Sequence, residues 1–446
     1  MGGKVFPRSF KTHAPLIVKG DGIYLEDENG KRYIDGCSGA LISNLGHCVP
    51  EIIEAVTKQL NTIEFAHSSR WRTEASEDAA REVASTAPEG MNYVWFVCGG
   101  SEAIESAVKL ARQYYVERDG ASTSKAQVIA RWNSYHGSTL GTMALGGRMN
   151  MRRVFSPLLL DFPKISPHYC YRCPYGAEYP SCKLACAREL ESTIRRIGPQ
   201  YISAFIAEPI VGASVGALIP PKEYWPMIRD ICDRYDILLI ADEVMTGCGR
   251  TGANFCLDHW NVKPDIIAIA KGMAAGYVPT GGIIVRDEIA EMLRDGSGVF
   301  IHGHTYNGNP LSGAATAAVF RYIKQHNLVQ NSLVQGGHLL AGLQKIAANS
   351  PVIGEARGKG LMCGLEIVAD KNTRAPFPKA KGAASLLMEE CLKNGLVLYP
   401  GSGMIDGMEG DNISIAPPLV VTRDQVADIL GRLEKGLAAA ENKLLS

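Results

Sequence analysis

The sequence predicts an α/β fold with a large, doubly wound, mainly parallel sheet and a small α+β domain made from both chain ends. Short apolar runs rich in β-branched residues recur between about Tyr93 and Val285, and each is followed by a glycine or a polar residue. Stretches with helical spacing separate these runs, an alternation typical of parallel sheets covered by helices. A hairpin signal near the N-terminus and an amphipathic C-terminal helix predict the second domain.

The two chain ends supply the small domain in this prediction. Residues 23–27 and 31–35 are expected strands, and Asn29-Gly30 between them is typical of a type I′ turn. Thr422 and Gln425 have the spacing of a capping box, and the helix after them has one apolar face suited to core packing. We expect residues 1–65 to form the N-terminal part of the small domain, 66–320 the large ligand-binding domain and 321–446 the C-terminal part.

The first strand of the large sheet is expected from Tyr93 to Val97, and it leads into Gly100 and Ser101. Apolar residues then recur at helical spacing, so the glycine and serine lie where a strand turns into a helix. Free N–H groups at a helix N-terminus, close approach at glycine and a serine hydroxyl favour binding of a phosphate. An ordinary capped helix start would show the same residues.

Two further strands carry polar residues at their carboxyl ends. Val128 to Arg131 leads to Tyr135 and His136, and Ser203 to Ala207 leads to Glu208. Tyr135 could stack on a planar cofactor, although on its own it could equally be a half-buried surface tyrosine. Because ligands bind at the carboxyl ends of strands in such sheets, we expect these side chains in one crevice.

The apolar runs 237–241 and 265–270 predict two more buried strands, which end in Asp242 and Lys271. Burial lowers the pKa of a lysine, so its free amine can condense with an aldehyde as a Schiff base. Taken alone, a lysine such as Lys271 is more often a strand-end lysine whose ammonium group reaches water. Beside an aspartate and an anion-binding turn, it predicts a site for amine and phosphate chemistry.

The composition excludes several classes of partner. The chain has 446 residues, with 46 basic and 46 acidic side chains, and this balance gives no reason to expect nucleic acid or an anionic membrane as a partner. No run approaches the roughly 18 to 20 apolar residues of a membrane span. Met1 to Pro7 lack the apolar core of a signal peptide, and the chain has 12 cysteines, so we expect a reducing, cytoplasmic location.

Much of the chain resembles the class III aminotransferases, which are pyridoxal-phosphate (PLP) enzymes of fold type I. The matching stretches follow one another in the family's order: FVCGGSEAIESAVKLAR, SYHGSTLGTMALGG, IAEPIVGASVGALIPP, LLIADEVMTGCGRTG, PDIIAIAKGMAAGYVPTGG, HGHTYNGNP and ISIAPPLVVT. The resemblance is highly specific and covers nearly the whole chain, from Gly22 to the last helix. It implies an aminotransferase with PLP as its cofactor.

The resemblance implies a role for each candidate residue. Lys271 is similar to the lysine that binds the cofactor aldehyde and then moves a proton, and Asp242 to the aspartate that pairs with the pyridine nitrogen. Thr305 resembles a threonine that reaches the phosphate of the neighbouring subunit, which implies a homodimer, or a tetramer built from such dimers. The other candidates would hold the phosphate (Gly100, Ser101), flank the ring (Val244 on one face, Tyr135 or His136 on the other) or support the site (Glu208).

Departures from the family pattern bear on the substrate. Ala213 and Met245 stand where the ornithine, acetylornithine and γ-aminobutyrate branch has a glutamate and a glutamine, which disfavours that branch. Tyr399 stands where the pyruvate-dependent ω-amine branch usually has a carboxylate-binding arginine, and a tyrosine cannot make that bidentate charged contact. Arg70 or Arg72 could bind the carboxylate instead, or the acceptor differs.

We expect a transaminase that moves an amino group from an ω-amine or amino-acid donor to a keto acid by a ping-pong mechanism. The segment from His168 to Pro174, with Cys182 and Cys186, resembles an insertion in taurine:pyruvate aminotransferase-like members, which favours the ω-amine side; pyruvate is the expected acceptor, and 2-oxoglutarate stays open. Taurine, β-alanine, a polyamine and a β-amino acid all fit as donor, because the arrangement of pocket residues such as Ser38, Leu41 and Trp71 is not visible in the sequence.

Two alternatives remain open. An amino-acid epimerase or aminomutase on the same scaffold would use the same lysine and aspartate. A non-catalytic metal-binding protein would instead use Cys170, Cys173, Cys182 and Cys186, which offer enough thiolates for a zinc ion. These cysteines could equally pack as small hydrophobic residues, and our site prediction includes no metal ligand.

Overall fold

A computed structural model describes residues 4–10 and 14–446. The other six residues belong to the predicted segment 1–65, and the first three also to the stretch tested for a signal peptide; they lie outside the described residues. Within the described ranges the central sheet has seven strands, in the order β4 (Tyr93–Val97), β10 (Gly281–Val285), β9 (Ile266–Ala270), β8 (Leu238–Asp242), β7 (Ile202–Ala207), β5 (Gln127–Arg131) and β6 (Lys164–Ile165). Strands β9, β8, β7, β5 and β6 run parallel, whereas β10 is antiparallel to both of its neighbours. The expected strands of the large sheet are confirmed.

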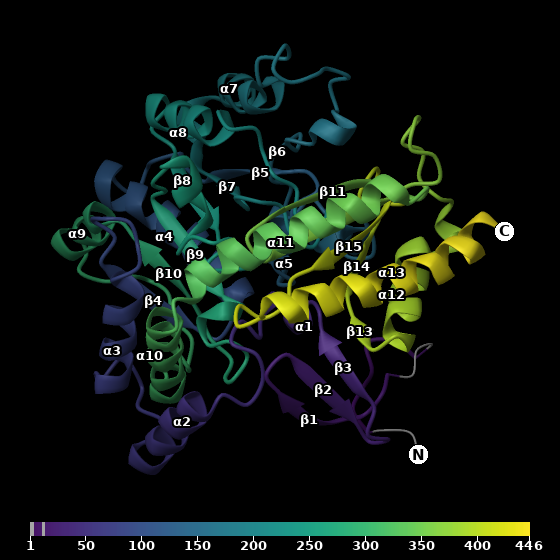
Figure 1. Ribbon diagram of the computed structural model, residues 1–446. Helices are drawn as coiled ribbons and strands as arrows, with labels where there is room; N and C mark the ends of the chain where they lie inside the picture. Colours follow the sequence, from purple (N-terminus) through teal and green to yellow (C-terminus); the bar gives the residue numbers. More distant parts are fainter. Residues whose placement is uncertain (1–3, 11–13) are drawn as a thin grey trace.

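Both faces of the central sheet are buried, because alternate residues of each strand pack under different helices. Ile240 packs under α4 (Gly100–Asp119) and α9 (Asp287–Asp295). Its neighbour Leu239 faces α7 (Ala185–Ile197) and α8 (Tyr224–Arg234), seen at the top of Figure 1. Near β9, helices α3 (Glu74–Ala84) and α10 (Pro310–Gln325) contribute Val83 and Phe320 to a third cluster, with Ile267 and Ile269. This explains why these strands are apolar throughout.

A second sheet joins the two ends of the chain. It contains β1 (Ile17–Asp21), β2 (Tyr24–Asp27), β3 (Arg32–Asp35) and β13 (Leu396–Val397), with β13 parallel to β3. The boundaries proposed for the domains stay a prediction, but strands from both ends lie side by side here.

The predicted hairpin forms between β2 and β3, but the prediction of a type I′ turn is wrong. A type I′ turn needs a positive φ at both central residues. Here Gly30 has a φ of 76°, and Asn29 is not among the residues with a positive φ. Asp27 instead organises a longer loop, because its side chain accepts the Asn29 and Lys31 amides at 2.9 and 3.0 Å.

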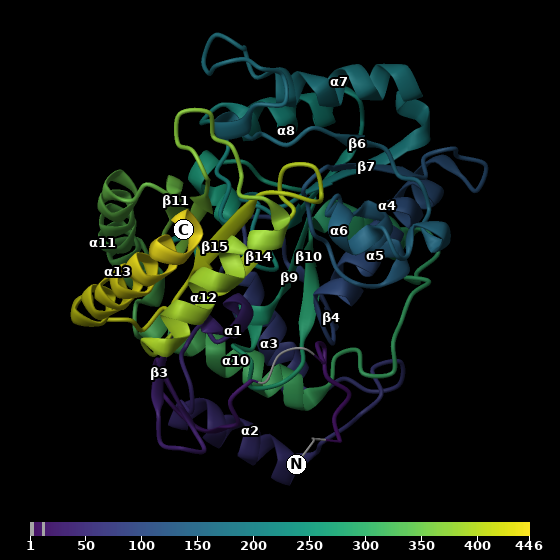
Figure 2. The same cartoon turned by 90° about the vertical axis from the view of Figure 1, so that its right-hand side faces the viewer.

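The C-terminal residues build a third sheet that is covered by long helices. Its antiparallel strands are β11 (Ile353–Lys359), β12 (Met362–Ile367), β15 (Asp411–Ile415) and β14 (Tyr399–Ser402). Figure 2 shows α11 (Leu328–Asn349), α12 (Ala383–Lys393) and α13 (Arg423–Leu445) on the same side of the molecule as this sheet. Thr422 caps α13 through the predicted capping box with Gln425, and the apolar face of α13 enters the core. No helix within residues 4–10 and 14–446 is long and apolar enough to cross a membrane.

The buried side chain of Arg250 connects segments that are far apart in the sequence. Its guanidinium donates to the carbonyls of Leu361 and Pro417 at 3.0 and 2.6 Å, and to Asn44 and Ser38 at 2.6 and 3.2 Å. Burial lowers its pKa to about 10.

The remaining α-helices of the described residues are α1 (Ser38–Leu41), α2 (Pro50–Thr62), α5 (Leu140–Leu145) and α6 (Met149–Arg152).

Candidate active site

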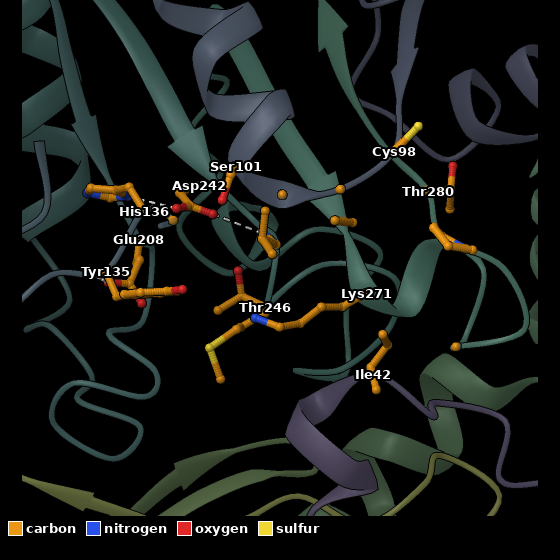
Figure 3. Close-up of a pocket in the computed structure, with 18 of the residues that line it drawn as sticks. Ile42, Cys98, Ser101, Tyr135, His136, Glu208, Asp242, Thr246, Lys271 and Thr280 are labelled. Atoms are coloured by element: carbon orange, nitrogen blue, oxygen red, sulfur yellow. Dashed lines mark hydrogen bonds and ion pairs between the residues drawn. The ribbon is translucent and has the colours of Figure 1, made fainter. Parts of the chain in front are cut away.

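A cavity of about 460 Å³ lies at the carboxyl ends of β8 and β9, beside the N-terminus of α4 (Figure 3). Most of the residues predicted for the site line it: Gly100, Ser101, Tyr135, His136, Glu208, Asp242, Val244 and Lys271. The exception is Thr305, which is exposed in the loop before α10. The cavity also contains Ile42, Thr246 and Thr280, which the sequence reasoning missed because nothing in their spacing indicates chemistry.

Lys271 follows β9 directly, and its side chain extends into the cavity. It has a left-handed φ of 47°, which is unusual for a residue with a side chain. Burial lowers the pKa of its amine, while the carboxylates of Asp242 and Glu208 act in the opposite direction. The cavity therefore favours the neutral amine that carbonyl chemistry requires.

Asp242 ends β8 and is held from two sides. Its Oδ2 accepts from His136 Nδ1 at 2.7 Å, and its Oδ1 accepts from the Val244 amide at 3.1 Å. Both side chains of the pair are buried. His136 Nε2 is also buried, without a hydrogen-bond partner within the described residues. His136 therefore fixes the orientation of a carboxylate that faces the cavity.

Glu208 connects the loop after β5 to the end of β7. Its carboxylate accepts the amides of Tyr135 and Gly212, each at 2.9 Å. Burial raises the pKa of Glu208; His136 lowers it and Asp242 raises it further. Tyr135 is thereby held against the cavity wall by its backbone, which leaves its ring free to contact a ligand.

The residue after Asp242 has a structural role. Glu243 is buried but does not line the cavity, and its carboxylate accepts the Leu257 amide at 3.0 Å and the Thr246 hydroxyl. Burial raises its pKa to about 7, although these hydrogen bonds act against the rise.

The N-terminus of α4 offers donors for an anion. The backbone N–H groups of Gly100 and Ser101 have no acceptor among the described residues, as expected for the first turn of a helix. Gly137 lies against this turn with a φ of 136°, and a Cβ built on it would lie 2.5 Å from Ser101 Oγ. Thr280 adds a buried hydroxyl without a partner in the described part of the chain. A glycine-lined cradle with free donors fits a phosphate group.

These features define the class of protein. A lysine with a lowered pKa, a fixed aspartate and an anion-binding helix N-terminus share one cavity, at the position where this type of sheet binds ligands. The orphaned Thr280 hydroxyl and the cradle at Gly137 fit pyridoxal phosphate. The fold and the site are those of a PLP enzyme of fold type I.

Comparisons with known proteins show the family. The model of the family "Aminotransferase class-III" matches residues 6–437, so the chain belongs to the class-III aminotransferases, which depend on PLP. It is 35% identical to putrescine–pyruvate aminotransferase of Pseudomonas aeruginosa, over 95% of this chain and 90% of that protein. It is 38% identical to "Probable gamma-aminobutyrate transaminase 3, mitochondrial" of Oryza sativa subsp. indica, over 98% and 84%.

A solved structure agrees with this assignment. The PLP-bound amine transaminase from an uncultivated Pseudomonas species superposes with a TM-score of 0.91, at 35% identity, over 99% of this chain and 98% of that one. The chain is thus an aminotransferase that acts on amines and keto acids.

The positions that depart from the family pattern gather beside the cavity. Leu41, Ala213 and Met245 belong to one hydrophobic cluster, and Tyr399 packs against it. Of these, only Met245 lines the cavity. The hydroxyl of Ser38 bonds to a backbone carbonyl and to Arg250, so it supports the fold.

The arginines first considered for carboxylate binding are both exposed and do not line the cavity. Arg72 forms an ion pair with Glu77 at 2.7 Å.

The four cysteines Cys170, Cys173, Cys182 and Cys186 line a small hollow of about 20 Å³. Within the described ranges, however, no three His, Cys, Asp or Glu side chains gather closely enough to hold a metal ion.

Proposed function

We propose that this enzyme transfers an amino group from an ω-amine or amino-acid donor to a keto acid, with pyruvate as the first candidate, in two half-reactions of a ping-pong cycle. The observation that carries the proposal is the shared cavity of Lys271, Asp242 and the α4 N-terminus. A relative at 35% identity is named for putrescine and pyruvate. The cytoplasmic location stays a prediction.

Lys271 is proposed to hold the cofactor aldehyde and then to move the proton. Its amine, kept neutral by burial, would take a proton from the substrate carbon and deliver it to the carbon that was the cofactor's aldehyde. When bound, pyridoxal phosphate supplies a ring that takes up the electron pair left on the substrate carbon. Asp242 would face the ring nitrogen, and His136 would keep the carboxylate in that direction.

The other cavity residues would position the cofactor. The α4 N-terminus at Gly100 and Ser101 would hold the phosphate, and Val244 would cover one face of the ring. Tyr135 is the better candidate for the opposite face, because the ring nitrogen of its neighbour His136 is already bonded to Asp242. Glu208 would support Tyr135 through its backbone.

A homodimer is proposed, in which Thr305 completes the site of the partner, or a tetramer of such dimers. Thr305 is exposed, and the loop around it presents the apolar side chains of Ile301 and Tyr306, which are 79% and 59% exposed. Exposed apolar groups close together are typical of interfaces between subunits. Light scattering of the holoenzyme measures the state, and a monomer with full activity would refute the shared site.

The two half-reactions can be separated by experiment. A donor such as putrescine, added alone, is expected to bleach the cofactor absorbance until pyruvate restores it. Recovery with 2-oxoglutarate but not with pyruvate would assign a different acceptor. An enzyme that keeps its colour while it inverts its amino-acid substrate would be an epimerase, an alternative that membership of the aminotransferase family does not favour.

A further inference from the structure

Arg148 is a half-buried cation without a partner. Within residues 4–10 and 14–446 its guanidinium makes neither a hydrogen bond nor an ion pair, and its Nε is fully buried and unsatisfied. Burying an uncompensated charge is costly, and a bound anion would offset this cost. Arg148 therefore differs from its neighbour Arg152, which donates to the backbone carbonyls of Ala144 and Gly146, each at 2.8 Å.

The backbone places Arg148 next to the active-site loop. The preceding Gly147 amide bonds to the carbonyl and the hydroxyl of Ser134 at 3.0 and 3.1 Å, and Ser134 precedes Tyr135. A Cβ on Gly147 would lie 2.5 Å from the Trp132 Cα, so the two segments are in close contact. Arg148 therefore directly follows a residue that is bonded to the segment carrying Tyr135.

On its other side Arg148 adjoins β14, the strand that starts with Tyr399. Asn150, two residues further along, donates to the Ser402 carbonyl of β14 at 3.0 Å. Burial lowers the pKa of Arg148, and the nearby cation Arg8 acts in the same direction, while Tyr399, Tyr135 and Glu208 act in the opposite direction. Among the described residues Glu208 forms no ion pair with Arg148; its carboxylate accepts two backbone amides instead.

Arg148 lines a second cavity, of about 430 Å³, together with the charged side chains of Arg172 and Asp406. Arg172 is paired with Glu366. Asp406 accepts the amides of Met408 and Glu409 at 2.8 and 2.9 Å. Ser214 also lines this cavity, and its hydroxyl is buried without a partner among the described residues. In the described part of the chain, the unsatisfied donors of this cavity are thus the Arg148 guanidinium, the Arg172 Nη2 and the Ser214 hydroxyl, a set that suits a carboxylate ligand.

We propose that Arg148 binds the carboxylate of the keto-acid acceptor, the function for which Tyr399 carries no charge. This inference rests on the proposed transfer to a keto acid and deepens it by naming the residue that recognises the acceptor. A guanidinium pairs with a carboxylate through two parallel hydrogen bonds, and it stays charged at any working pH. Arg148 does not line the Lys271 cavity itself, but Gly147 before it bonds to Ser134, the residue before Tyr135, whereas Arg70 and Arg72 are exposed.

The test compares Arg148→Met with Arg153→Met, which removes the same charge from an exposed position five residues along. With pyruvate, Arg148→Met is expected to raise KM roughly 10- to 100-fold, the range for a hydrogen bond to a charged group. With propanal, an acceptor without a carboxylate, the same variant is expected to keep the rate of the wild type. Arg153→Met is expected to leave both reactions unchanged.

A binding measurement separates this inference from the proposed function. Calorimetric titration of the holoenzyme with propionate, which cannot react, is expected to give binding that Arg148→Met abolishes and Arg153→Met retains. An unchanged KM for pyruvate, or an equal loss with propanal, would overturn the role of Arg148. A wild type that transfers no amino group would refute the proposed function, while the propionate titration would still decide whether Arg148 binds a carboxylate.

Discussion

Replacing His136 with phenylalanine removes the side chain that holds Asp242 while keeping an aromatic ring in the same buried space. In the wild type, Nδ1 of His136 donates to the Asp242 carboxylate at 2.7 Å, and among the residues that the structure describes only the Val244 amide supports the carboxylate otherwise. Without the imidazole, Asp242 can rotate away from the direction in which we expect the ring nitrogen of the cofactor. His136 would then be a positioning residue that acts through Asp242.

The size of the effect follows from the type of hydrogen bond. A bond to a charged group contributes about 1.5 to 3 kcal/mol, which corresponds to a roughly 10- to 100-fold loss in kcat/KM of the donor half-reaction. The assay is single-turnover bleaching of the cofactor absorbance by an amine donor. His136→Asn is the matched control, because its side-chain amide can donate from about the position of Nδ1, and it should recover most of the rate.

Two results would refute this reasoning. Full activity of His136→Phe would mean that Asp242 needs no support from the imidazole. If His136→Asn were as impaired as His136→Phe, with both variants folded and the same absorbance maximum, the hydrogen bond would not be the reason for the loss.

Further predictions concern stability and cofactor binding. Arg250→Met should lower the free energy of unfolding by about 3 to 5 kcal/mol, because two buried carbonyls lose their donor; an unchanged denaturant midpoint would contradict this. Gly137→Ala should weaken PLP binding at least about tenfold, since its Cβ would collide with the phosphate cradle, while Gly120→Ala, which has open space around it, should bind PLP normally in equilibrium dialysis. The folded protein keeps the Glu243 proton up to a pKa of about 7, whereas the unfolded chain loses it near 4.5, so stability falls as pH rises through this window. Glu243→Gln should remove this fall, so that above pH 7 its free energy of unfolding in denaturant titrations exceeds that of the wild type by up to about 3 kcal/mol. If the pH profiles of the two proteins ran parallel, the prediction would be wrong.

The strand ends were predictable because the inner strands β7, β8, β9 and β10 of the central sheet are buried on both faces. Such strands must be apolar throughout, so the first polar residue after each run marks the edge where ligands bind. Asp242 and Lys271 were found in this way, and both line the cavity. The roles proposed for them remain predictions.

Contacts between segments far apart in the sequence were not predictable. The hydrogen bond between His136 and Asp242 joins residues 106 positions apart. Arg250 bonds both to Asn44, earlier in the sequence, and to Leu361, later in the sequence. The prediction of a type I′ turn was wrong for a local reason. The Asn29-Gly30 signal does not take into account the Asp27 side chain, which accepts the backbone amides of Asn29 and Lys31. Arg148 gave no signal either, since a sequence does not show that a charge is left without a partner.

The most direct test of the central claim is to reduce the PLP-loaded enzyme with borohydride and map the labelled peptide. We predict that the cofactor becomes covalently attached to Lys271 alone, with a stoichiometry of about one per chain. Lys271→Ala should carry no label while still binding PLP reversibly. A label on a different lysine, or none on the wild type, would contradict the account of this site.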